Sequence, residues 1–160
     1  MSKKSINVKL LREIKKMILE EPRRLNMAHF AEMFADSAQP TEGNDYEPKK
    51  EERPPCGAVM CIAGHALLAE ERSRGFFRKR FTRPVVDRIR TAAEGEAQDL
   101  LGLTDEQAER LFYFTDWNWL GDEGWPEEFA DAYIKAKTPA QRARVTARRI
   151  EHFIKTNGAE

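Results

Sequence analysis

The hydrophobic pattern of the chain centres on residues 54–69, its longest stretch without a Lys, Arg, Asp or Glu. This stretch is too long for a typical strand, and its small residues lie all round a helix rather than along one stripe. Small residues on every side let neighbouring helices approach closely. Pro54 and Pro55 forbid an earlier start, because the residue before a proline is pushed out of the helical region. We therefore predict a central, buried helix over about residues 57–72.

Elsewhere, apolar residues recur at three- and four-residue spacing, which is typical of amphipathic helices. Leu11, Ile14 and Ile18 belong to such a helix near the N-terminus, and Pro22 closes it. The apolar run 26–34 is short and predicts a brief helix. Further helices are expected from the cap Thr82 to Leu101, after Thr104, from Pro126 to Ala136 and from Thr138 to Gly158.

Polar residues mark the ends of several of these helices. Thr104 with Gln107, and Thr138 with Gln141, form capping boxes, in which hydroxyl and amide side chains satisfy backbone donors of the first turn. Gly102 is a stop signal, because glycine readily adopts the left-handed conformation that ends many helices.

The pattern as a whole indicates an all-α fold. No segment alternates like a strand, and 160 residues fit one domain that can bury its own core. We predict a single compact domain over residues 1–160, with about six helices packed around the central one. Residues 37–55 are rich in Pro, Gly, Asn, Asp and Glu and predict a flexible surface loop.

Charge is balanced in total but unevenly distributed. The chain has 27 basic and 27 acidic residues, so its net charge identifies no partner. Residues 72–90 carry eight basic side chains against Asp87 alone, whereas residues 91–133 carry twelve acidic ones against Arg110 alone. The last helix is basic again. Such a chain can present a basic face to phosphates, or use opposed faces to bind a charged protein or itself.

The basic segment also carries aromatic rings that could stack on nucleic-acid bases. It predicts a surface that binds an anionic or nucleic-acid ligand or a protein partner. The alternative is that acidic and basic helices are neighbours in the fold and that the phenylalanines are core residues. The candidate binding residues are Arg74, Phe77, Arg78, Lys79, Arg80 and Arg83.

A second candidate surface is the acidic loop that contains all three tryptophans, Trp117, Trp119 and Trp125. Exposed tryptophans beside carboxylates would suit a protein partner or a cationic ligand, because Trp is enriched at interface hot spots. Buried tryptophans would instead plug the helical core.

Two cysteines and a histidine form the third candidate site. Cys61 and His65 are four residues apart and share a helix face, and Cys56 could fold toward them, which gives three ligands that zinc accepts. The alternative is that both thiols are small buried apolar groups. Cys56 at a helix N-terminus is also superficially similar to the nucleophile of papain-like peptidases, but those enzymes place their histidine on a β-sheet half that this chain does not offer.

Several motifs together resemble a group of small, uncharacterised helical proteins of bacterial and phage type. They are Cys56-Gly57-x-x-x-Cys61-Ile62-Ala63-Gly64, the stretch 101–108, Trp125-Pro126 and the stretch 149–154, which span roughly the last two thirds of the chain. Ala58 and His65 stand where the group often has a hydroxyl residue and a tryptophan. The resemblance implies no activity, cofactor or catalytic residue.

The N-terminus leads into an amphipathic segment, and no apolar run approaches the length that spans a membrane. We expect a cytoplasmic protein with no membrane partner, in which reducing conditions keep the cysteines as thiols or metal ligands. The function that we predict is non-enzymatic binding through the basic aromatic and acidic Trp-bearing surfaces. The alternative is a metal-binding or thiol-active protein centred on Cys56, Cys61 and His65. The pattern does not indicate an oligomeric state.

Overall fold

The computed structural model describes residues 5–27, 31–33, 58–74, 86–114 and 124–159. These residues form six α-helices that pack together, which confirms the predicted all-α fold. The helices are α1 (Val8–Glu20), α2 (Ile62–Arg74), α3 (Val86–Leu101), α4 (Asp105–Phe112), α5 (Glu127–Lys135) and α6 (Pro139–Thr156), and a 3₁₀ turn, η1 (Pro22–Arg24), follows α1.

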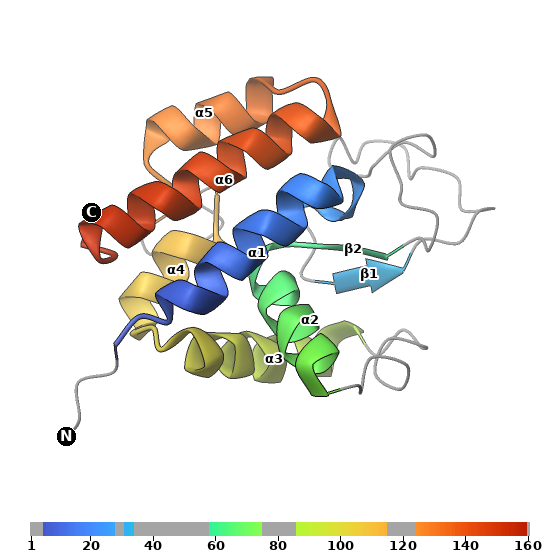
Figure 1. Ribbon diagram of the computed structural model, residues 1–160, viewed down its shortest axis with the longest axis vertical. Coiled ribbons are helices and arrows are strands. Elements are labelled where there is room, and N and C mark those ends of the chain that lie inside the picture. The colour runs from blue at the N-terminus through green and yellow to red at the C-terminus, as the bar shows by residue number, and fades with distance from the viewer. Residues whose placement is uncertain (1–4, 28–30, 34–57, 75–85, 115–123, 160) are drawn as a thin grey trace.

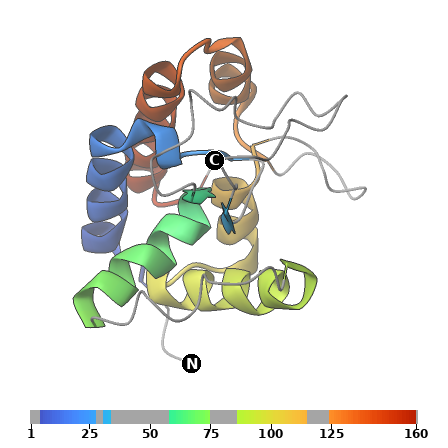
Figure 2. The same ribbon diagram turned by 90° about the vertical axis from the view of Figure 1, so that its right-hand side faces the viewer.

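α1 lies between two groups of helices. It packs most extensively against α6 on one side and against α2 on the other. Figures 1 and 2 both show α5 and α6 paired at one end of the molecule and α2 and α3 together at the opposite end. None of the helices in the described ranges is both long and apolar enough to span a lipid bilayer.

Two short strands were not predicted. β1 (Ala31–Met33) and β2 (Ala58–Met60) pair antiparallel, with Ala31 opposite Met60. The predicted brief helix over 26–34 is therefore wrong at residues 31–33, and the predicted central helix begins at Ile62 instead of residue 57. A short apolar run does not reveal by its periodicity whether it forms a helix or a strand. Here each of the two runs satisfies backbone groups of the other by pairing as strands. The carbonyl oxygen of Met60 also accepts a hydrogen bond from the Asn26 amide at 3.1 Å.

The buried position of the central segment is confirmed. Every residue from Cys61 to Ala69 is buried, so this part of α2 has no solvent-exposed side. Small side chains such as Ala63 and Ala66, both fully buried, let α1 and α3 pack directly on it.

The local signals at helix ends are confirmed as well. The capping boxes of Thr104 with Gln107 and of Thr138 with Gln141 are both formed, at the starts of α4 and α6. Gly102 ends α3 with φ of 65°, and a Cβ atom there would lie 2.3 Å from the Ser5 carbonyl oxygen. Only glycine fits where the N-terminal segment crosses this turn.

The C-terminus of α4 is capped by side chains that lie far along the sequence. The last four carbonyls of a helix have no partner within it. Two of them accept hydrogen bonds from buried side chains: Arg110 from Arg149 Nη2 at 2.8 Å, and Leu111 from Trp125 Nε1 at 2.9 Å. A cation at this end also complements the helix dipole. Segments far along the chain are thereby attached to α4.

Candidate functional site

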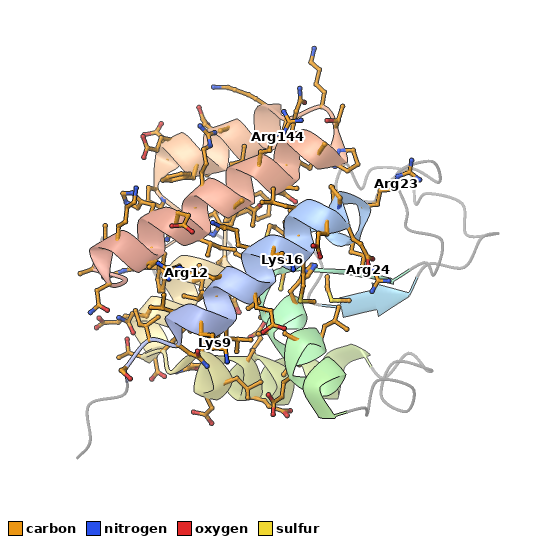
Figure 3. The ribbon with its side chains drawn as sticks, in the orientation of Figure 1. Lys9, Arg12, Lys16, Arg23, Arg24 and Arg144 are labelled. Atoms are coloured by element: carbon orange, nitrogen blue, oxygen red, sulfur yellow. The ribbon has the colours of Figure 1, made fainter. Side chains whose placement is uncertain are left out.

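A group of three exposed cations lies on α1. Its apolar residues point into the core, so Lys9, Arg12 and Lys16, at spacings of three and four residues, share the solvent side. Figure 3 shows these three side chains spaced along the helix. The exposed carboxylates of Glu13 and Glu20 share this side, so the row carries three cations and two carboxylates and owes its net positive charge to the former.

Neighbouring elements extend this row. Arg23 and Arg24 follow α1 in η1, and Arg144 is exposed on α6, which packs beside α1 (Figure 3). Arg24 is paired with Glu21, and Lys16 lies 3.7 Å from Glu20 in an exposed pair that contributes little to stability. We call the following residues the basic face: Lys9, Arg12, Lys16, Arg23, Arg24 and Arg144.

Basic side chains outnumber acidic ones in this region. Residues 5–27 contain six basic and three acidic side chains, and α6 contains five basic ones and one acidic one, Glu151. Glu151 pairs with Lys15 and so ties α1 to α6. The hydrogen bond from Lys15 lowers the pKa of Glu151, and the charges of Arg12 and Lys155 act in the same direction. By contrast, residues 94–112 carry six acidic side chains and one basic one.

A groove opens next to the basic face, between α1, α5 and α6. Its lining includes two rings, Phe129 and His152, whose centroids are 5.3 Å apart at an interplanar angle of 49°. Both side chains are half-buried. The other lining residues are Lys15, Leu19, Glu128, Ala147, Arg148, Glu151 and Lys155.

Most of the binding residues predicted from the sequence lie outside the described residues: Phe77, Arg78, Lys79, Arg80, Arg83, Trp117 and Trp119. The backbone of Arg74 forms the last residue of α2. Their role in binding therefore stays a prediction.

Trp125 belongs to the core. It is 5% exposed, and its ring makes edge-on contacts with Phe114 and Tyr133 at centroid distances of 6.3 and 5.7 Å. Tyr133 is itself buried, which raises its pKa to about 12, and its hydroxyl accepts a hydrogen bond from the Met27 amide. Trp125 therefore fills part of the helical core, as the alternative interpretation of the tryptophans predicted, and is not an exposed binding residue.

Cys61 and His65 lie together in the core. Cys61 immediately precedes α2, and its carbonyl oxygen lies 2.9 Å from Nδ1 of the buried His65. A carbonyl oxygen can only accept, so Nδ1 carries the proton. Burial raises the pKa of the Cys61 thiol to about 11, which keeps it protonated at neutral pH. Among the residues that the structure describes, no three His, Cys, Asp or Glu side chains form a group that could hold a metal ion, and Cys56 lies outside them.

Cys61 is expected to resist alkylation in the folded protein. The thiolate is the reactive form, and a buried thiol with a raised pKa supplies very little of it at about pH 8. The protein is treated with iodoacetamide, digested, and the modified Cys61 peptide is quantified by mass spectrometry. The same protein unfolded in guanidinium chloride gives the level of full reaction. Rapid modification of Cys61 without denaturant would contradict its buried position and favour thiol chemistry.

Neither the basic face nor the groove was predicted from the sequence, because α1 has the apolar spacing of an ordinary core-facing helix. A signal was nevertheless present: Lys9, Arg12 and Lys16 fall on one helical side, together with Glu13 and Glu20, and the last helix is basic too. The groove carries no local signal, because it depends on how three helices pack. No protein-family model, curated protein or solved structure matches the chain.

Proposed function

We propose that the protein is a non-enzymatic binding protein that docks its basic face on the phosphate backbone of a nucleic acid. The observation that carries this proposal is the exposed row of Lys9, Arg12 and Lys16 on α1, with Arg144 beside it on α6.

The dimensions of the row suit a polyanion. A helix rises about 1.5 Å per residue, so the row from Lys9 to Lys16 is about 10 Å long. Successive phosphates of one DNA strand are about 3.4 Å apart along the duplex axis. The row therefore spans several phosphates, and the long side chains of Lys and Arg can adjust to them. Neutralising these phosphates releases bound counterions, which drives binding at low salt.

The Cys/His alternative gains less support from the described structure. The Cys61 thiol is protonated and buried, and Nδ1 of His65 is engaged by the Cys61 carbonyl oxygen. Neither group is presented to solvent. The proposal therefore rests on the surface charge.

The double variant Arg12→Gln/Lys16→Gln is expected to bind nucleic acid about tenfold more weakly at roughly 50 mM salt. Two lost phosphate contacts also reduce the slope of log affinity against log salt by about 1.8 for a duplex. Binding is measured by fluorescence anisotropy with a labelled duplex of mixed sequence over a range of salt concentrations. Both side chains are exposed, so the thermal midpoint should change little.

The matched control is Lys135→Gln/Lys137→Gln, which removes the same charge from exposed lysines at the end of α5 and in the turn after it. Its affinity should stay within twofold of wild type. The proposal fails if the wild-type protein binds no nucleic acid at low salt, or if the control weakens binding as much as the α1 variant. The same series on Arg78, Lys79 and Arg80 tests the predicted basic aromatic segment.

A further inference from the structure

The groove between α1, α5 and α6 differs chemically from the basic face. The basic face consists of cations, which suit phosphates. The groove combines two rings, Phe129 and His152, with the carboxylates Glu128 and Glu151. A site for phosphate alone needs neither rings nor carboxylates, since a carboxylate repels a phosphate.

A nucleobase is the ligand that uses all of these groups. Bases stack on aromatic side chains, and this stacking tolerates any sequence because every base has a π-face. The exposed carboxylate of Glu128 can accept hydrogen bonds from the exocyclic amino groups of bases, while Glu151 is paired with Lys15. The apolar side chains of Leu19 and Ala147 complete a surface of mixed polarity.

The groove also lies close to the side chains that are proposed to contact phosphates. Arg148 lines it and lies one helical turn after Arg144 of the basic face, on the same side of α6. On the other wall, Lys15 lines the groove and lies between Arg12 and Lys16 in sequence. Arg148, on the side of Arg144, therefore links the groove to the basic face, so a strand held on the face can place a base in the groove.

We infer that this groove receives an unpaired base and that the nucleic acid bound by the basic face is single-stranded. The inference rests on the proposed function. In a duplex the faces of the bases are stacked on one another, so a base that meets Phe129 and His152 must be unpaired or extruded, at a cost in free energy. Single-stranded substrates avoid this cost.

Phe129→Leu and His152→Gln are expected to weaken binding of a mixed-sequence single strand about five- to thirtyfold each, which is the range for loss of one stacked base. Binding of the matching duplex should change less than twofold, because it makes only the backbone contacts. Wild-type protein should prefer the single strand. Leu retains most of the apolar volume of Phe129, and thermal unfolding checks that each variant is folded. Ile134→Ala, an exposed apolar residue on α5 outside the groove lining, is the matched control and should change neither affinity.

The outcomes separate this inference from the proposed function. Equal binding of single strand and duplex, unaffected by the ring substitutions, would overturn the groove assignment and leave the basic face in place. Absence of binding to either nucleic acid would overturn both. Binding of poly-glutamate as tight as that of the single strand would overturn the inference in favour of an acidic protein partner.

Discussion

Trp125→Ala is expected to lower the free energy of unfolding by about 4 kcal/mol, in the range measured when a buried Trp or Phe is truncated. The substitution leaves a cavity beside Phe114 and Tyr133 and removes the donor that satisfies the Leu111 carbonyl at the end of α4. The loss is measured by guanidinium chloride unfolding followed by circular dichroism, with wild type and variant compared at equal protein concentration.

Trp125→Phe separates the two causes. It retains most of the ring volume and loses only the hydrogen bond, so it should cost about 1.5 kcal/mol. If Trp125 were an interface residue instead, both variants would fold with near wild-type stability and lose binding. That result would contradict its assignment to the core.

Arg149→Ala is expected to lower the free energy of unfolding by about 3 kcal/mol. Arg149 is fully buried, its guanidinium lies 5.8 and 5.5 Å from the ring centroids of Phe129 and Phe153, and it donates to the Arg110 carbonyl. Alanine removes the ring contacts, the hydrogen bond to α4 and the packed side-chain stem together. Unfolding in guanidinium chloride measures the difference.

Two comparisons test the origin of this loss. Arg149→Met keeps a long unbranched stem, so it should cost only about 1 kcal/mol, because the unsatisfied carbonyl is then the main penalty. Arg148→Ala removes an exposed neighbour and should change stability by less than about 0.5 kcal/mol. Equal losses for the Met and Ala variants of Arg149 would show that packing of the stem is unimportant.

Features set by neighbours in sequence were predictable. The capping boxes at Thr104 and Thr138 and the stop at Gly102 each depend on a few consecutive residues, and all three appear as expected. The burial of residues 61–69 followed from the absence of charged side chains. In each case the local preference and the tertiary structure agree.

Features set by distant contacts were not predictable. The strand over Ala58–Met60 forms because Ala31–Met33, much earlier in the chain, supplies its partner, and nothing in its own sequence identifies that partner. Arg149 caps α4 by donating to a carbonyl 39 positions earlier in the chain. In the sequence, this buried arginine cannot be distinguished from the surface cations of the same basic helix. The groove likewise requires α1, α5 and α6 to be placed together before Phe129 and His152 become neighbours.

The absence of a solvent-exposed side from Cys61 to Ala69 limits how this protein can diverge. At these positions a new charged residue would be buried, and a larger side chain would displace a neighbouring helix. Substitutions there are restricted to exchanges between apolar residues of similar size. The exposed cations of α1, by contrast, can be replaced as the ligand changes. Distant relatives should therefore share the profile of α2 even where their binding surfaces have become unlike, which makes this segment a suitable probe for common ancestry.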